Sequence, residues 1–86
     1  MWALEIRLSE TPERLAARPA HRELVARLHQ EGKVRMSGPF ADDTGALVLF
    51  DVEDQAEAEQ LIASDPYYST TGVEIVSVRE WNPLFG

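Results

Sequence analysis

The chain contains no cysteine among its 86 residues. Disulfide bonds, thiolate metal sites and cysteine nucleophiles are therefore excluded, and the composition fits a reducing compartment. Long apolar stretches are also missing. The longest wholly apolar run, from Ala46 to Phe50, is far too short to cross a bilayer, and the first residues lack the basic and apolar regions of a secretory signal. We expect a cytoplasmic protein that does not enter membranes.

Positive charge is scarce as well. Eight lysine and arginine residues stand against fifteen aspartate and glutamate residues, for a net charge of −7. Such a chain repels phosphate backbones, and we expect no nucleic-acid partner. The sequence has no phosphate-binding loop, no dinucleotide fingerprint and no Gly-x-Ser-x-Gly motif. With none of these motifs, no organic cofactor is expected. His21 and His29 lie eight residues apart without a third ligand, so no metal site is expected either.

The first half of the chain has the pattern of a strand, a helix and a second strand. Residues 2–8 alternate between apolar and other side chains, which predicts a strand with one apolar face. The polar segment 9–18 is predicted as a loop with at most one helical turn. Pro19 then suits the first turn of a helix that ends near Gly32. Val34 and Met36 begin a short strand that stops at Gly38-Pro39.

The second half repeats this order. A turn at residues 42–45 leads into a nearly continuous apolar strand over 46–52. Asp54 and Glu57 resemble a capping box for a second helix, which must end by Asp65 because Pro66 follows. Residues 73–81 are the last strand. The sequence thus predicts one α+β domain over 1–86: a ferredoxin-like βαββαβ fold with a four-stranded antiparallel sheet, the first and third strands central, and both helices on one face.

The uncovered sheet face and an apolar tail predict a homodimer. Residues Trp81, Pro83, Leu84 and Phe85 would be exposed on a monomer together with the second face of the sheet. Exposed apolar surface of this kind is typical of subunit contacts. The alternative is a tail that folds back on its own sheet.

His21 and Asp65 are the principal candidates for chemistry. His21 shares a helix face with Leu24, Val25 and Leu28, in what is predicted to be the first turn, where the helix dipole favours a neutral imidazole that can act as a base. Asp65 extends the apolar stripe of the second helix at its unfavourable carboxyl end, and could orient that imidazole. Equally, His21 could be a core histidine with its nitrogens satisfied by backbone, and Asp65 could cap a short turn through Tyr67 and Tyr68.

Several other residues are candidates for binding a small-molecule ligand. Arg7 and Glu5 share one face of the first strand, either in solvent or in a cavity where Arg7 could hold an anion. The remaining candidates are a cation next to the helix, a phenol, and the residues that end the second strand: Arg18, Tyr67, Gly38 and Pro39. His29 is interpreted as a surface residue near the end of the first helix.

Taken together, the chain resembles the YCII-related family. The resemblance rests on Arg18-Pro19-Ala20-His21, Glu31-Gly32, Gly38-Pro39 and Asp65-Pro66-Tyr67, in this order and over nearly the whole chain. It implies a ferredoxin-like domain that dimerises through its sheets into an α+β barrel, as in muconolactone isomerase. It also implies that His21 and Asp65 face a shared pocket as a catalytic dyad.

The resemblance further implies lyase-like elimination on a small cyclic or aromatic compound. Our prediction is a lyase or isomerase without cofactor, in which His21 abstracts a proton and Asp65 orients it. The alternative is a non-catalytic ligand-binding or assembly module on the same dimeric fold. A cofactor-free monooxygenase is a third possibility, which no residue specifically favours.

Overall fold

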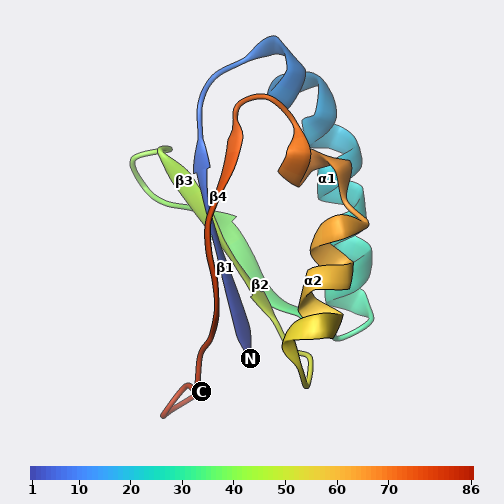
Figure 1. The fold of residues 1–86 in the computed structure, drawn as a ribbon, viewed down its shortest axis with the longest axis vertical. Helices are drawn as coiled ribbons and strands as arrows, with labels where there is room; N and C mark the ends of the chain where they lie inside the picture. Colours follow the sequence, from blue (N-terminus) through green and yellow to red (C-terminus); the bar gives the residue numbers. More distant parts are fainter.

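Four antiparallel strands form one sheet in the order β2-β3-β1-β4, and both helices lie on the same face of it (Figure 1). The computed structural model describes residues 1–86. Its elements are β1 (Trp2–Leu8), α1 (Pro12–Gln30), β2 (Val34–Pro39), β3 (Gly45–Phe50), α2 (Gln55–Ala63), the 3-10 helix η1 (Pro66–Ser69) and β4 (Val73–Glu80). The predicted ferredoxin-like fold is confirmed, with β1 and β3 in the centre.

The alternation in β1 decides which side chains enter the core. Leu4 and Ile6 point to the helix face and are 0% and 2% exposed, whereas Arg7 lies on the other face and is exposed. Leu4 pairs with Val48 of β3 on one side and with Val78 of β4 on the other. A register shift between Glu5 and Ile6 marks a bulge toward β4. The side chains of β1 therefore alternate between the core and the outer face of the sheet.

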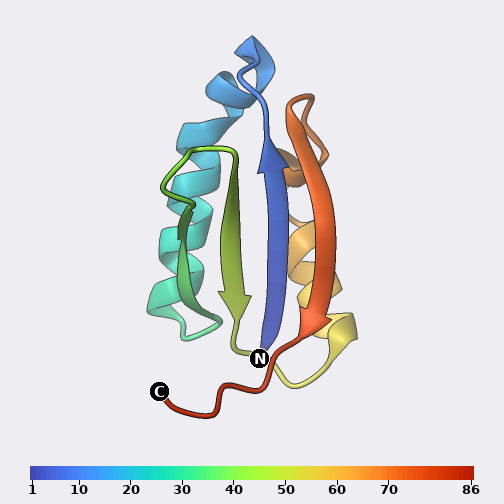
Figure 2. The same cartoon turned by 90° about the vertical axis from the view of Figure 1, so that its left-hand side faces the viewer.

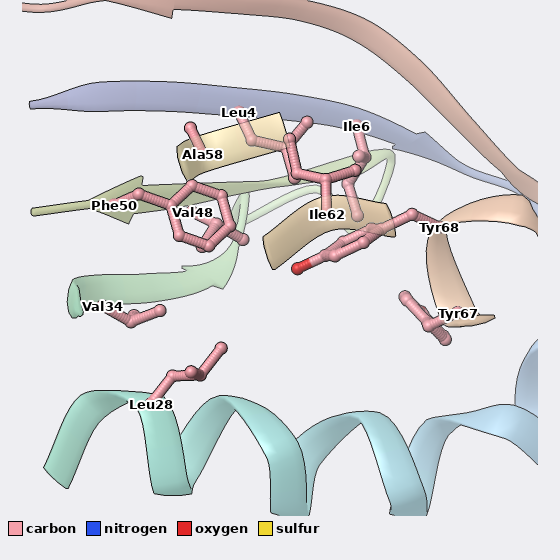
Figure 3. Close-up of a cluster of buried hydrophobic side chains, with 10 residues drawn as sticks. All are labelled: Leu4, Ile6, Leu28, Val34, Val48, Phe50, Ala58, Ile62, Tyr67 and Tyr68. Atoms are coloured by element: carbon pink, nitrogen blue, oxygen red, sulfur yellow. The ribbon is translucent and has the colours of Figure 1, made fainter. Parts of the chain in front are cut away.

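The core lies between the sheet and the helices (Figure 3). Its buried side chains come from every element except β4: Leu4, Ile6, Leu28, Val34, Val48, Phe50, Ala58, Ile62, Tyr67 and Tyr68. Helix α2 contributes Ala58 and Ile62 and is capped by Asp54, whose carboxylate accepts a hydrogen bond from the amide of Glu57 at 2.9 Å. Neither helix is both long and apolar enough to cross a membrane.

The prediction that the first helix begins at Pro19 was wrong. Thr11 caps the helix by accepting a hydrogen bond from the amide of Arg14 at 3.1 Å, and Pro12 occupies the first turn, where its missing N–H is harmless. Pro19 therefore lies inside α1. There it cannot donate to the carbonyl of Leu15, but Pro19 and Leu15 are both exposed, so that water can serve this carbonyl.

No helix covers the second face of the sheet, onto which Figure 2 looks. On the edge strand β4, Ile75 and Val76 are 43% and 44% exposed. The tail leaves the sheet after the amide of Trp81 donates to the carbonyl of Met1, and Leu84 and Phe85 are 87% and 89% exposed. A tail folded back onto its own sheet is thus contradicted.

Gly45 is required where β3 begins, opposite Arg7 of β1. A Cβ at this position would collide with the backbone carbonyl of Ile6 and press on the ring of Phe40. Since backbone in the middle of a sheet cannot yield, we expect Gly45→Ala to lower the free energy of unfolding by about 1–3 kcal/mol. Urea denaturation of this variant would measure it. Gly38→Ala is the matched control, because nothing lies within 4 Å of a Cβ there, and an equal loss in both would contradict this account.

Candidate active site

A hydrogen bond joins His21 of α1 to Asp65, 44 residues further along the chain. The distance from Nδ1 of His21 to Oδ2 of Asp65 is 2.6 Å, and their side chains are 15% and 4% exposed. A distance this short is typical of charge-assisted hydrogen bonds to carboxylates. The structure therefore brings together the two residues that the sequence singled out.

The electrostatic prediction was wrong for His21 and incomplete for Asp65. His21 lies in the middle of α1, not in its first turn, because the helix begins at Pro12. Asp65 follows the end of α2 but caps the N-terminus of η1, where its Oδ1 accepts a hydrogen bond from the amide of Tyr67 at 3.0 Å. A carboxylate at this end of a helix is favoured. Asp65 thus serves as a cap and as the partner of His21 at once, with one oxygen for each.

Two tyrosines of η1 enclose the imidazole. The ring of Tyr67 stacks on His21 with 4.0 Å between centroids and 14° between planes, and Tyr68 meets His21 edge-on at 5.3 Å. Burial, and secondarily the negative charge of Asp65, raises the pKa of the Tyr68 phenol above its ordinary value. Tyr68 therefore stays protonated at neutral pH and is not available as a base. The stack holds the ring of His21 in one plane.

His21 and Tyr67 line a cleft of about 980 Å³ between α1 and the strands β2 and β3, which we call the main cleft. A smaller hollow of about 650 Å³, the side cleft, lies on the other side of His21 and is bordered by Asp65. Since Nδ1 of His21 faces Asp65, the second ring nitrogen, Nε2, points away from it. The volume of the main cleft lies in the range typical of small-molecule sites.

Most of the predicted binding residues lie on the main cleft. Arg18, Tyr67, Gly38 and Pro39 all line it. Arg7 does not, because it lies on the opposite face of the sheet, 63% exposed, with Glu74 3.5 Å away. The structure therefore does not bring Arg7 together with His21 within one subunit.

Arg14 is the residue of the cleft that the sequence analysis missed. It is only 8% exposed, its Nε donates to the carbonyl of Ser9 at 2.8 Å, and its Nη1 donates to the hydroxyl of Tyr67 at 3.2 Å. If the helix had been predicted to begin after Thr11, Arg14 would have been identified, because Arg14 and Arg18 then lie one turn apart on the helix face of His21. His29 is exposed, as predicted, but it also lines the main cleft and pairs through Nδ1 with the carbonyl of Val34 at 2.9 Å.

No group of three or more histidine, aspartate or glutamate side chains is placed to hold a metal ion. The groups able to act on a ligand are an imidazole with a carboxylate behind it, a phenol and several guanidinium groups. Such a set can remove a proton and stabilise the negative charge that results.

Comparisons with known proteins agree with this architecture. A sequence model described as the YCII-related domain matches residues 1–82. Protein YciI of Escherichia coli O6:H1 is 31% identical, with 85% of each chain covered, and so is protein YciI of Shigella flexneri. The uncharacterized protein YjpA of Bacillus subtilis is 31% identical over 71% of each chain.

A solved structure shares the fold at 19% identity. It is 5-chloro-2-hydroxyhydroquinone dehydrochlorinase (TftG) from Burkholderia phenoliruptrix AC1100, in complex with 2,5-dihydroxybenzoquinone. The TM-score is 0.60, and the match covers 95% of this chain and 94% of the other. The family match spans nearly the entire sequence, and the structural match confirms the fold. This chain belongs to the YCII-related domain family.

Proposed function

We propose that the protein is a lyase or isomerase that removes a proton from carbon in a small cyclic or aromatic compound. The observation that carries the proposal is the 2.6 Å bond between Nδ1 of His21, which lines the main cleft, and Oδ2 of Asp65, which lies behind it on the side cleft. In this arrangement His21 is the base, and Asp65 is the residue that positions it.

The bond to Asp65 selects the tautomer of His21. A carboxylate can only accept, so Nδ1 carries the proton and Nε2 keeps its lone pair. Because Tyr67 occupies the other oxygen of Asp65 through its amide, the carboxylate cannot turn away. When Nε2 takes up a proton, the negative charge of Asp65 stabilises the imidazolium that forms.

A positioned base that takes a proton from carbon can serve two reaction classes. In an elimination, Nε2 takes the proton, the electrons of the C–H bond form a carbon–carbon double bond, and the leaving group departs with its electron pair. In an isomerisation, the same proton returns at another carbon. The dehydrochlorinase activity in the name of TftG, which shares the fold, supports the first of these for a ring compound.

The test is a screen of the purified protein with chlorinated hydroxyhydroquinones and small lactones, following chloride release and ultraviolet absorbance. Turnover without added cofactor supports the proposal. Saturable binding without any product across the screen would instead identify a non-catalytic ligand-binding module.

Asp65→Asn separates the two tasks of this residue. The amide oxygen of asparagine can still cap η1, but its NH₂ group would face Nδ1 and favour the tautomer protonated on Nε2. We expect kcat to fall by roughly 10- to 100-fold with KM little changed, the range found when carboxylates that orient metal-bound imidazoles are removed. Ring ¹⁵N signals of His21 should show the change of tautomer.

Asp54→Asn is the matched control for this substitution. It is the same change at another helix cap, in contact with the amide of Glu57 and not with an imidazole. Its kcat should equal that of the wild type. If Asp65→Asn leaves both kcat and the ¹⁵N signals unchanged, the positioning role is refuted.

A further inference from the structure

Charge is distributed unevenly between the main cleft and the rest of the protein. Although acidic residues outnumber basic ones fifteen to eight, the cleft is lined by four arginines and only two acidic residues, Glu10 and Asp43. The four are Arg14, Arg18, Arg22 and Arg35. Only Arg35 has a carboxylate within 4 Å, that of Asp51 at 3.9 Å. The main cleft is thus a basic site in an acidic protein.

Helical spacing places three of these four arginines on one face of α1. Arg14, Arg18 and Arg22 follow one another at intervals of four residues along α1, and Val25 lines the cleft beside the next turn. Like charges at this spacing repel one another and destabilise a helix. Local arrangements that oppose stability are typical of functional sites, since a ligand can compensate them.

Arg14 is the strongest indication of what this ligand carries. The residue is only 8% exposed, yet both hydrogen bonds of its guanidinium go to uncharged acceptors, the carbonyl of Ser9 and the hydroxyl of Tyr67. No carboxylate lies within salt-bridge distance of it. Buried charges in proteins are ordinarily paired, because an isolated one loses its hydration without compensation. An anion in the main cleft would supply the missing countercharge.

The hydroxyl of Tyr67 adds a hydrogen-bond donor at the same place. Because its oxygen accepts from Arg14, its own proton remains free to donate. We infer that the main cleft binds its ring compound through an anionic oxygen, that of a carboxylate or of an ionised phenol or enol. Arg14 and Arg18 provide the countercharge and Tyr67 donates to the oxygen. The inference rests on the proposed function in placing the ligand beside His21, and it adds the charge of the substrate.

This arrangement would also serve the reaction. Proton removal by His21 leaves negative charge on the ring compound, and fixed cations in a partly buried cleft stabilise such charge without having to reorganise. Neutral ring compounds would lack both the attachment point and part of this stabilisation.

The experiment compares benzoate with benzamide, which has the same shape but no charge, by calorimetric titration of the full chain. We expect benzoate to bind roughly 10- to 100-fold more tightly, the usual contribution of a hydrogen bond to a charged group. Arg18→Gln should weaken benzoate several-fold and leave benzamide unchanged. Arg14→Gln should weaken benzoate more, provided its circular dichroism matches the wild type. Arg18 takes no part in the hydrogen bonds that Arg14 makes to Ser9 and Tyr67, so its variant tests the idea even if Arg14→Gln does not fold.

Arg27→Gln is the matched control, since Arg27 is an exposed arginine of α1 that borders the side cleft and not the main cleft. Equal affinities for the two probes, no binding of benzoate at millimolar concentration, or an equal loss in Arg27→Gln and Arg18→Gln would each overturn the inference. The outcome is separate from that of the proposed function. Selective benzoate binding without turnover of any substrate would refute only the enzyme, and turnover of neutral substrates with equal probe affinities would refute only the anionic ligand.

Discussion

Replacement of His21 by asparagine is expected to lower kcat by about 10²- to 10⁴-fold, the usual contribution of a positioned general base. The side-chain amide of asparagine can still donate to Oδ2 of Asp65, as Nδ1 of His21 does at 2.6 Å. Asp65 therefore keeps a partner and the wall of the cleft keeps its hydrogen bond. What the variant loses is Nε2, which in the proposed mechanism receives the proton.

The measurement is kcat and KM on a substrate found in the screen, with thermal unfolding recorded for both proteins. KM should change by no more than a few-fold, because ligand binding is assigned to Arg14, Arg18 and Tyr67. His29→Asn is the matched control. His29 lies on the same helix and also lines the main cleft, but its Nδ1 pairs with a backbone carbonyl and not with a carboxylate.

Two results would contradict the assignment. If His29→Asn loses as much activity as His21→Asn, the base has been placed on the wrong histidine. If His21→Asn does not fold, the imidazole and its stack on Tyr67 serve the core, as in the alternative interpretation of His21.

The strands could be predicted from the sequence because their signal is local. The alternation from Trp2 to Leu8 indicates which side chains of β1 meet the core. The apolar run before Asp51 indicates a second strand that lies in the centre of the sheet. The cap at Asp54 and the C-terminal Gly32, with φ of +81°, were also local signals and located the ends of helices well.

The first turns of α1 could not be predicted in the same way. Pro19 satisfies the local rule for a helix start, but Thr11 and Pro12 satisfy it too, and tertiary contacts favour the earlier start. Thr11 donates to the carbonyl of Thr71 at 2.6 Å and Arg14 donates to Tyr67, so the helix start is tied to the segment around η1 and β4. Both contacts span more than 50 residues, and no window of sequence contains them.

The candidate site could be predicted only in part, because some of its contacts also join residues far apart in the sequence. His21 and Asp65 stood out through the motifs that carry the family resemblance. Arg14 did not, because a charged residue in a segment predicted as loop is expected in solvent, and its burial depends on Tyr67. Arg7, in contrast, was a candidate that the structure places outside the main cleft. Its strand was identified correctly, but the sequence did not indicate that the main cleft would open on the other face of the sheet.

Phe50→Ala is expected to have the largest effect on stability. Phe50 is 1% exposed and lies at the end of β3, paired with Trp2 on one side and with Val34 on the other. Its ring packs among side chains of both layers (Figure 3). Removing a buried phenylalanine ring forfeits its transfer free energy and leaves a cavity, for a loss of about 3–5 kcal/mol. Domains have a total stability of roughly 5–15 kcal/mol, so the variant should lose a large share of it.

Urea denaturation followed by tryptophan fluorescence would measure this loss, and the melting temperature should fall by more than about 12 °C. Phe85→Ala makes the same chemical change at a ring that is 89% exposed, and at low protein concentration its unfolding midpoint should equal that of the wild type. Similar losses in both would contradict the assignment of Phe50 to the core. The control also bears on the predicted homodimer. A loss in Phe85→Ala that grows as the protein concentration rises would mean that a second copy covers the tail, since only association makes stability depend on concentration.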